Sequence, residues 1–576
     1  NGMVVGASGV LNVGSLSVYT PNDVVYSRYK NNPTKDLSTL ENSYGGKEVT
    51  INGKVFAAND VLLNGGKVTV GKDGAVMAGI NENKMLAMNS NAQAEALFNQ
   101  LVNTDNLNKG NQFASSNGNV YIKSNQRLDD AGVDISGTIK NFGTGNTEIR
   151  STGVDGIKIA GTVSNADGLL KINNNWGDLN ISGDVKNKGT TQIFNVPGES
   201  TVTFEVNGQK YSYKLDTNNG TDISGNIDTI GDLTITNTGD KGLNISGTVN
   251  NDGNLNIQNG IAGSNSTSEI RNNRTQALNI SGTVTNTGNA TINNDAKGGL
   301  LVSGTVENAD GKLSMVNNGN EGFTVTNSGT VNGISKDGLS SDIEMINNNG
   351  SFNIDGQVIG DGGQIDLTNN GTEFNINGTV KQVGNQYDGR IYSAEDVNIT
   401  NNSGNLNING DILGKDSQKT TNILNKGNTL NISKSGNIDT SGTLNITNEG
   451  SGGFIIDGNV TNTNETMQDS AGEGGYYAGD TTLTNKVGYF KINGNVTGVN
   501  NSNVYINNSG SGIEINGNIN ANGISQRNSI EERGNNVYIN NTNGAINLNS
   551  SGRVNATQDV NIKNTATGGV NVKGLV

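Results

Sequence analysis

The sequence predicts an all-β fold, a right-handed parallel β-helix (β-solenoid) with coils of about 22 residues. A short phrase repeats at a fixed interval, since Ile280-Ser-Gly-Thr-Val284 and Val302-Ser-Gly-Thr-Val306 begin 22 residues apart. Apolar and polar residues also alternate in short runs, as half-buried strands require. Asn and Gly separate these runs, and no helical pattern intervenes. The right hand is expected from the general preference of parallel crossovers.

The composition excludes several classes of function. Only 32% of the 576 residues are hydrophobic and 83 are Gly, yet the regular alternation argues against disorder. The 38 Lys and Arg against 53 Asp and Glu give a net charge of −15, which disfavours nucleic acid as a partner. The chain has no Cys and no His, so disulfides, thiolate sites and the commonest metal ligand are absent. No apolar run approaches the ~18 residues of a membrane-spanning segment.

The first part of the chain combines short strands with one helical pattern. Short strands are expected within residues 1–34 and 49–80, and Pro21 and Pro33 bracket an irregular stretch. Residues 86–103 predict a short side helix, with an apolar face around Leu97 and Leu101. This helix either packs on the side of the solenoid or binds a partner, and we favour packing because its apolar stripe must be buried.

From residue 131 onward the coil phrase is nearly continuous. Some intervals are longer than 22 residues, as between Ile245 and Ile280, and indicate either an inserted loop or an extra short coil. The aligned residues of the phrase are Ile135, Ile159, Ile181, Ile223, Ile245, Ile280, Val302, Val325, Ile354, Ile376, Ile408, Ile432, Ile456, Ile492, Ile515 and Val572, with a weaker instance at Leu548.

Within one coil, residues 243–249 form an alternating run up to a glycine turn, and residues 255–257 form a second strand. Leu243, Ile245, Leu255 and Ile257 should then share one interior, while Asn244 and Ser246 face solvent. We expect two roles for Asn: left-handed backbone at the corners, and side-chain hydrogen bonds to equivalent residues one coil away.

Three insertions interrupt the shaft, near residues 186–220, 382–395 and 463–480. The first contains an alternating segment, 200–216, centred on Asn207-Gly208, which predicts a β-hairpin outside the coil. The last should be an exposed loop. Aromatic side chains in these insertions either pack on the coil or contact a ligand, and the candidates are Phe204, Tyr211, Tyr213, Tyr387, Tyr392, Tyr476 and Tyr477.

No catalytic, cofactor-binding or metal-binding residues are expected. Glycan-cleaving β-helices need gathered carboxylates, but the acidic residues here are scattered, with pairs only at Asp129-Asp130 and Glu531-Glu532. Many Asn-X-Ser/Thr sequons occur, as at Asn244 and Asn279, either as glycosylation sites or as a by-product of the coil phrase, which we favour.

The first 120 residues resemble the secretion domain of filamentous haemagglutinin-type exoproteins. Asn1-Gly2-Met3-Val4 looks like the second half of that family's Asn-Pro-Asn-Gly motif, and residues 54–74 are similar to the next segment of that family's domain. The resemblance implies a partial secretion-domain cap at 1–130 and then a repetitive shaft at 131–576. It also implies export through an outer-membrane β-barrel transporter by two-partner or related type V secretion. The chain begins like a piece of a longer protein.

The expected function is that of a secreted or surface-exposed filamentous adhesin of a diderm bacterium. A long β-helical rod would attach to glycans or proteins of host or other bacterial cells through many shallow contacts. Three alternatives stay open: a polysaccharide-degrading enzyme, the stalk of a contact-dependent toxin, and a cytolysin.

Overall fold

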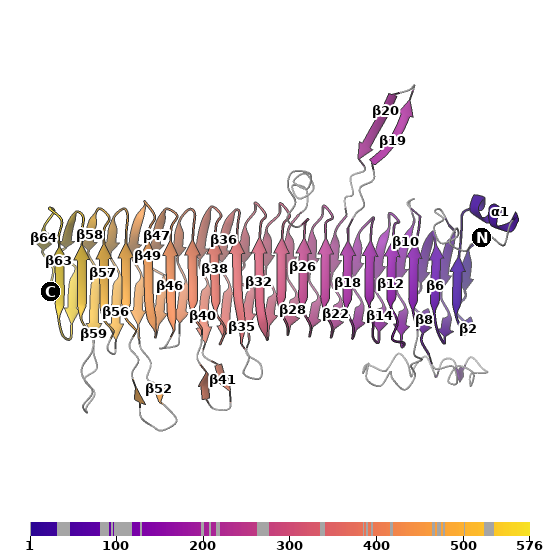
Figure 1. Cartoon of the computed structure of the whole chain (residues 1–576), viewed down its shortest axis with the longest axis horizontal. Coiled ribbons are helices and arrows are strands. Elements are labelled where there is room, and N and C mark those ends of the chain that lie inside the picture. Colours follow the sequence, from indigo (N-terminus) through magenta and orange to yellow (C-terminus); the bar gives the residue numbers. More distant parts are fainter. Residues whose placement is uncertain are drawn as a thin grey trace. The chain divides into compact units, whose positions relative to one another are not determined.

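A computed structural model of the chain describes residues 2–31, 46–80, 92–93, 96, 118–126, 130–196, 201–206, 209–214, 219–261, 276–334, 340–383, 385–387, 390–392, 395–414, 419–463, 467–468, 474–475, 479–499, 502–522 and 535–576. The fold is a right-handed parallel β-helix, as the sequence predicts. The strands belong to two compact units, which are Asn1–Thr287 with Asn294–Gly298 (unit 1) and Gly288–Asn293 with Gly299–Val576 (unit 2). In each unit the chain passes in turn through three parallel sheets, here named A, B and C (Figure 1).

Unit 1 contains these strands. Sheet A holds β1 (Met3–Val5), β4 (Glu48–Ile51), β7 (Lys67–Val70), β10 (Gly132–Ile135), β13 (Gly156–Ile159), β16 (Leu179–Ile181), β21 (Thr221–Ile223), β24 (Leu243–Ile245) and β27 (Leu278–Ile280). Sheet B holds β2 (Val10–Val13), β5 (Lys54–Ala57), β8 (Ala75–Ala78), β11 (Thr138–Asn141), β14 (Thr162–Asn165), β17 (Asp184–Asn187), β22 (Asn226–Thr229), β25 (Thr248–Asn251) and β28 (Thr283–Asn286). Sheet C holds β3 (Leu16–Tyr19), β6 (Val61–Gly65), β9 (Val120–Ser124), β12 (Thr147–Ser151), β15 (Leu170–Asn174), β18 (Thr191–Asn195), β23 (Leu233–Asn237) and β26 (Leu255–Asn259).

Unit 2 repeats the arrangement, and β29 (Ala290–Asn294) has residues in both units. Sheet A holds β30 (Leu300–Val302), β33 (Phe323–Val325), β36 (Ser351–Ile354), β39 (Glu373–Ile376), β44 (Leu406–Ile408), β47 (Thr429–Ile432), β50 (Gly453–Ile456), β55 (Phe490–Ile492), β58 (Gly512–Ile515), β61 (Ala545–Leu548) and β64 (Val570–Val572). Sheet B holds β31 (Thr305–Asn308), β34 (Thr330–Gly333), β37 (Gln357–Asp361), β40 (Thr379–Val383), β45 (Asp411–Gly414), β48 (Asn437–Thr440), β51 (Asn459–Asn462), β56 (Asn495–Val499), β59 (Asn518–Asn522) and β62 (Arg553–Ala556). Sheet C holds β32 (Gly311–Asn317), β35 (Ser341–Asn347), β38 (Ile365–Asn369), β43 (Val397–Asn401), β46 (Thr420–Asn425), β49 (Thr443–Asn448), β54 (Thr481–Asn485), β57 (Val504–Asn508), β60 (Val537–Asn541) and β63 (Val560–Asn564).

The aligned residues of the coil phrase mark one position of the fold. Each is the last residue of a sheet A strand, from Ile135 in β10 to Val572 in β64. The longer intervals are insertions and not extra coils, because β24 pairs directly with β27 and β50 pairs directly with β55. Each copy of the phrase in the sequence therefore corresponds to one coil of the structure.

One expectation about the coil needs correction. Residues 243–249 are not one run, because β24 ends at Ile245 and β25 begins at Thr248. The corner between them takes only Ser246 and Gly247, whose N–H groups both donate to the carbonyl oxygen of Ile223 on the preceding coil, at 2.9 and 3.0 Å. Because so short a corner does not interrupt the alternation of apolar and polar residues, the sequence does not reveal that this run contains two strands and that the coil has three.

The interior of each coil is apolar, as expected. Leu243, Ile245 and Ile257 are fully buried and Leu255 nearly so, whereas Asn244 and Ser246 are exposed. In unit 2 the equivalent sheet A positions stack aromatic rings on one another. The ring centroids of Phe352 and Phe374 lie 4.6 Å apart with an interplanar angle of 8°. Identical residues thus stack coil on coil within the core.

Asparagine provides the polar part of the interior. The ten strands of sheet C that lie wholly in unit 2 each end in a buried or half-buried Asn, and the Nδ2 of each but the last donates to the Oδ1 of the next, at 2.6–3.0 Å. This series, the asparagine ladder of unit 2, consists of Asn317, Asn347, Asn369, Asn401, Asn425, Asn448, Asn485, Asn508, Asn541 and Asn564. The same amides also bond the backbone of the corner that follows the strand. For example, Asn448 Nδ2 donates to the Gly450 carbonyl, and Asn448 Oδ1 accepts from the Gly450 N–H.

The other expected role of Asn, a left-handed backbone at the corners, holds for one described Asn, Asn535, and is wrong for the other described Asn residues. Among all described residues only Asp130 and Asn535 have positive φ without being Gly. The left-handed positions belong to glycines such as Gly322 and Gly453, with φ of 88° and 90°. Asn is selected for its amide and not for its backbone, because a buried corner leaves peptide groups that need partners.

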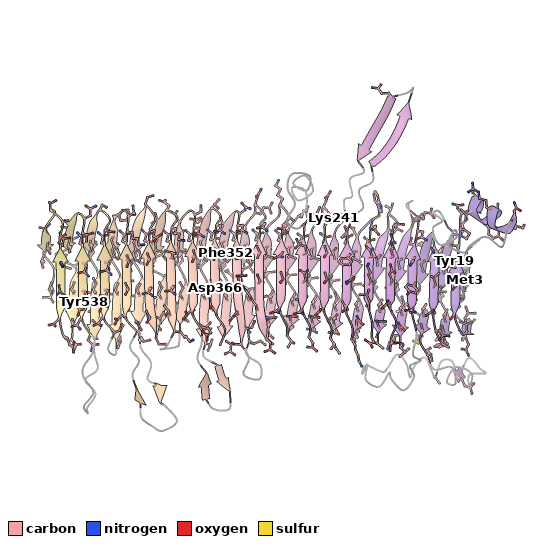
Figure 2. All side chains as sticks on the ribbon, in the orientation of Figure 1. Met3, Tyr19, Lys241, Phe352, Asp366 and Tyr538 are labelled. Carbon is pink, nitrogen blue, oxygen red and sulfur yellow. The ribbon has the colours of Figure 1, made fainter. Side chains whose placement is uncertain are left out.

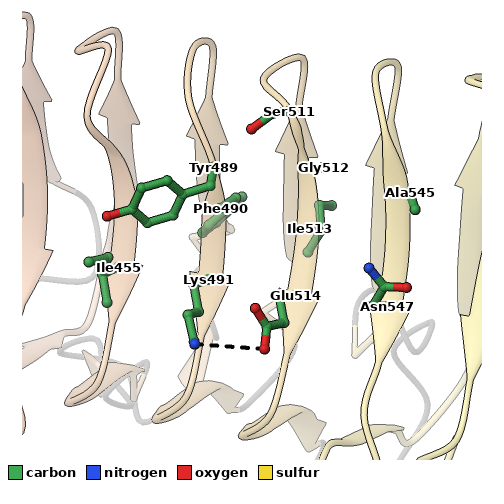
Figure 3. A pocket seen from close by; sticks show the side chains of 10 residues that line it. All are labelled: Ile455, Tyr489, Phe490, Lys491, Ser511, Gly512, Ile513, Glu514, Ala545 and Asn547. Atoms are coloured by element: carbon green, nitrogen blue, oxygen red, sulfur yellow. Dashed lines mark ion pairs between the residues drawn. The ribbon is translucent and has the colours of Figure 1, made fainter. Parts of the chain in front are cut away.

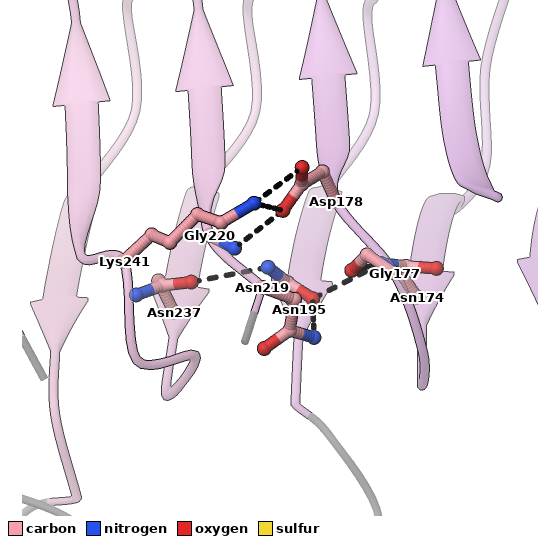
Figure 4. Close-up of polar contacts among 8 residues, drawn as sticks. All are labelled: Asn174, Gly177, Asp178, Asn195, Asn219, Gly220, Asn237 and Lys241. Carbon is pink, nitrogen blue, oxygen red and sulfur yellow. Dashed lines mark hydrogen bonds and ion pairs between the residues drawn. The ribbon is translucent and has the colours of Figure 1, made fainter. Parts of the chain in front are cut away.

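The predicted hairpin is confirmed in the backbone. Strand β19 (Thr201–Val206) pairs antiparallel with β20 (Gln209–Lys214), and Val206 lies opposite Gln209. Where the chain returns to the coil, Asn219 Nδ2 donates to Asn195 Oδ1 at 3.4 Å. Asp178 accepts from the Gly220 N–H at 3.0 Å and from Lys241 Nζ at 2.9 Å, so side chains of three successive coils hold this point together (Figure 4).

The two later insertions also contain antiparallel strands. Within 382–395, β41 (Asn385–Tyr387) pairs with β42 (Arg390–Tyr392). Within 463–480, β52 (Met467–Gln468) pairs with β53 (Gly474–Gly475), where the sequence predicted a loop alone.

The helical segments differ from expectation. The stretch expected to be irregular contains α1 (Asp23–Asn31). Its N-terminus is capped by Asn22, whose Oδ1 accepts from the Val25 N–H at 2.8 Å. Helix propensity does not predict this helix, because Val24 and Val25 are β-branched. The predicted helix at 86–103 lies outside the described residues except for Ala92, Gln93 and Ala96, which are helical.

Replacing Gly282 by Ala should destabilise the coil stack. A β-carbon on Gly282 would overlap the carbonyl oxygen of Gly247 on the preceding coil, and overpacking of this kind costs about 1–3 kcal/mol. Urea unfolding monitored by circular dichroism should show a lower midpoint. Gly14→Ala is the control, because no described atom lies within 4 Å of a β-carbon there. Equal midpoints for both variants would contradict the close stacking.

Replacing Asn425 by Ala should cost more than the same change at an exposed Asn. Asn425 is fully buried and bonds Asn401 and Asn448, each at 2.7 Å, so its loss leaves buried groups unpaired at about 1–3 kcal/mol. Asn402→Ala removes an exposed bond of the same length to Asn370 and should change stability by less than about 0.5 kcal/mol. Thermal unfolding of the two variants measures the difference, and a similar loss for both would disprove a special role for the interior ladder.

Candidate functional site on the outer face of unit 2

The outward side chains of successive coils form rows, and most rows satisfy their own hydrogen bonds. On sheet C of unit 2, Asn445 donates to Asn422, Asn422 to Asn398, and Asn398 to Asp366, at 2.9–3.1 Å (Figure 2 labels Asp366). Such a row presents a regular polar surface without a preformed cavity. A ligand on this surface would contact a row of amide groups whose hydrogen-bonding positions are partly used by neighbouring coils.

The same row contains two carboxylates on adjacent coils, which bears on the enzyme alternative. Glu344 and Asp366 are register partners in β35 and β38. Burial raises the pKa of Glu344, but hydrogen bonds from Lys312 and Ser314, both at 2.8 Å, and the charge of Lys312 outweigh burial, so its pKa is lowered. A general acid needs the opposite shift. In the part of the chain that the structure describes, no three His, Cys, Asp or Glu side chains gather as metal ligands would.

The outer face of sheet A in unit 2 has a hollow of about 540 Å³ (Figure 3). It exists because one outward row consists of Gly453, Tyr489, Gly512 and Ala545 on four successive coils, as the pairings of β50, β55, β58 and β61 show. A single large ring therefore stands among positions that have almost no side chain. Tyr489 is 46% exposed and forms one wall.

The next outward row along the same strands edges the hollow with polar groups. Ile455, Lys491, Glu514 and Asn547 succeed one another, and Lys491 Nζ lies 3.7 Å from Glu514 Oε1 (Figure 3). Glu514 also accepts from Asn516 Nδ2 at 3.0 Å, which fixes its orientation. The hollow thus combines an aromatic ring, an aliphatic side chain, a cation, an anion and an amide. With one carboxylate, which is ion-paired, this set of groups fits binding and not acid–base chemistry.

The aromatic residues of the insertions, which were expected either to pack on the coil or to contact a ligand, are not brought to this hollow by any described contact. Phe204, Tyr211, Tyr213, Tyr387 and Tyr392 lie on the hairpin strands β19, β20, β41 and β42, but only their backbone is described. Tyr476, Tyr477 and the first residue of the secretion motif, Asn1, lie outside the described residues, as do Asp129, Glu531 and Glu532. Gly2 is exposed beside β1.

Sequence reasoning missed Tyr489, Lys491 and Glu514, although a signal was present. Aligning the coils on Ile456, Ile492, Ile515 and Leu548 sets Tyr489 in a column with Gly453, Gly512 and Ala545. Only a comparison across coils reveals this column, because no local motif surrounds Tyr489.

Comparisons with protein-family models, with curated proteins and with solved structures find no match to this chain. Among the residues that the structure describes, no helix is long and apolar enough to cross a membrane.

Replacing Lys312 by Met should weaken the fold at neutral pH but not in acid. The pKa of Glu344 is lowered in the folded chain, so its ionised form stabilises the fold above the ordinary Glu pKa of about 4.3. That contribution is lost as the pH falls through the folded-state value. The difference in urea midpoint between the native chain and Lys312→Met should therefore be larger at about pH 6 than at about pH 3.

The effect should stay below ~1 kcal/mol, because both side chains are partly exposed. Glu344→Gln is the control background, in which Lys312→Met should have the same effect at both pH values. A difference independent of pH in the native background would mean that the ion pair does not set the titration of Glu344.

Proposed function

We propose that this chain is the β-helical part of a secreted or surface-exposed bacterial adhesin. The observation that carries the proposal is the arrangement of the outer faces, where hydrogen-bonding side chains recur on coil after coil around a closed apolar interior. Asn279 Nδ2 donates to Asn244 Oδ1 at 2.8 Å on sheet A, and Asn495 and Asn518 form an exposed row on sheet B. A surface of this kind offers many equivalent weak contacts to a target cell.

The physical advantage of such rows is their number. Neighbouring coils place equivalent side chains ~4.8 Å apart, so one polymer chain or one cell surface meets several of them at once. Once one contact forms, the others act at a high effective concentration, and the total affinity exceeds that of any single contact. The net charge of −15 disfavours phosphate-rich partners and leaves glycans and proteins as targets.

The route to the surface is part of the proposal and rests on the resemblance of the first 120 residues to haemagglutinin-type secretion domains. On this basis the chain is exported through an outer-membrane β-barrel transporter of a diderm bacterium. A β-helix suits such export, because each coil gains its partners from the coil before it and can fold as it emerges.

Three other functions predict different behaviour. A polysaccharide-degrading enzyme is the alternative for which the structure offers a specific feature, the adjacent Glu344 and Asp366. The stalk of a contact-dependent toxin would bind cells and deliver an effector domain. A cytolysin would lyse host cells as well as bind them.

The purified chain should retain cells and glycans without cleaving them. The assay measures binding to a glycan array and to epithelial and bacterial cells, with released reducing ends quantified in parallel. Retention without release is expected. If the native chain releases oligosaccharide and the double variant Glu344→Gln/Asp366→Asn does not, the chain is an enzyme and the adhesin proposal is wrong. If the native chain retains none of the glycans or cells, adhesion is refuted.

A triple variant, Phe204→Ala/Tyr211→Ala/Tyr213→Ala, tests the hairpin as a contact in the same assay. If the outer rows carry adhesion, the variant should keep most of the retention. Loss of retention by an otherwise stable variant would move the contact from the coil faces to the hairpin.

A further inference from the structure

We propose that the hollow beside Tyr489 is a binding subsite for an uncharged pyranose oligosaccharide. The inference rests on the proposed function, because it names the ligand class of one contact of the adhesin. Its volume, about 540 Å³, lies within the range of small-molecule sites, about 300–1,000 Å³.

The hollow has an aromatic wall that a flat apolar surface can cover. The Tyr489 ring lies against Gly453, where a β-carbon would stand 3.0 Å from its Cγ and Cδ1 atoms. Gly453 has φ of 90°, a conformation that disfavours any larger residue, so the space that the ring occupies is kept free of a side chain from that coil. An aromatic ring has few rotatable bonds, so it loses little entropy when a flat apolar surface stacks on it. Pyranose rings offer such a surface in their axial C–H groups.

The polar groups at the edge of the hollow include both donors and acceptors. Lys491 donates, Glu514 accepts, and Asn547 does both, while the Lys491–Glu514 pair has no net charge. Sugar hydroxyls donate and accept at once, so they match a mixed set better than an anion or a cation does. An anionic ligand would have to approach Glu514 in a chain of net charge −15.

The hollow does not suit an extended peptide that binds by strand addition. A peptide that adds as a strand needs unpaired backbone groups at a sheet edge. Strand β55 pairs with β50 and β58 on its two sides, and β58 pairs with β55 and β61. The backbone beneath the hollow is therefore already bonded, and a ligand must be recognised through side chains alone. A saccharide, with its flat face and polar rim, fits that requirement.

The test is a titration of the full chain with cellotriose and maltotriose, with a hyaluronan tetrasaccharide as the acidic comparison, measured by saturation-transfer NMR and calorimetry. A neutral trisaccharide should bind, and Tyr489→Ala should weaken it at least about tenfold. Tyr489→Phe keeps the ring and should stay within about threefold of the native chain. Ala545→Leu fills the hollow from its far side and should also weaken binding, although it leaves Tyr489 in place.

Tyr538→Ala is the matched control, since Tyr538 stacks on Tyr505 at 4.9 Å on sheet C of the same unit and does not line the hollow (Figure 2). It should leave the affinity unchanged. The inference is wrong if neither neutral sugar binds, if the acidic sugar binds tighter, or if Tyr489→Ala binds as the native chain does.

Cell retention by the same variants separates the two proposals. Loss of trisaccharide binding in Tyr489→Ala with retention of cells supports the subsite within a multivalent adhesin. Trisaccharide binding by a native chain that retains no cell supports the subsite and refutes adhesion.

Discussion

The parallel hydrogen bonding of each coil to the preceding one is the constraint on which the rest of the structure depends. It holds the backbones of neighbouring coils ~4.8 Å apart, both within the sheets and at the corners between sheets. At the corner between sheets A and B, only Gly fits, because a β-carbon on Gly247 or Gly282 would overlap the carbonyl oxygen of the preceding corner. At the end of sheet C, the same closeness brings amides within hydrogen-bond reach, so Asn425 bonds both of its neighbours. The glycine phrase and the asparagine content thus have one cause.

The same stacking determines what the surface can do. Outward residues stand in register, so a row of similar polar residues, such as Asn398, Asn422 and Asn445, bonds to itself and gives a uniform face. The hollow on sheet A lies where a row is uneven. Tyr489 between Gly453 and Gly512 is such a place, and there the coil spacing sets an aromatic ring beside bare backbone. In this fold the regular rows are therefore expected to supply many equivalent weak contacts, and an irregularity within a row is expected to supply a single, more specific subsite.

The period and the interior could be predicted because stacking repeats the same residue at the same place. Ile245 and Ile280 mark equivalent strand ends, and the alternation around them identified the buried face. The corner at Ser246-Gly247 could not be predicted because two residues do not break an alternating pattern. Helix α1 could not be predicted because Val24 and Val25 have poor helix propensity, and the Asn22 cap that its N-terminus has in the structure is a single side chain in a stretch rich in Asn. The hollow required the lateral register of four coils, information that no single stretch of sequence contains.

The central claim is the in-register stacking of coils, and disulfide trapping tests it most directly because the native chain has no Cys. In Asn398→Cys/Asn422→Cys the two Cα atoms should lie ~4.8 Å apart, within the range that a disulfide spans. In Asn398→Cys/Asn445→Cys they stand two coils apart, beyond the ~7 Å limit. Rapid intramolecular oxidation of the first pair and none of the second, measured by peptide mass spectrometry, is the predicted result. Equal oxidation of both pairs, or of neither, would contradict the account.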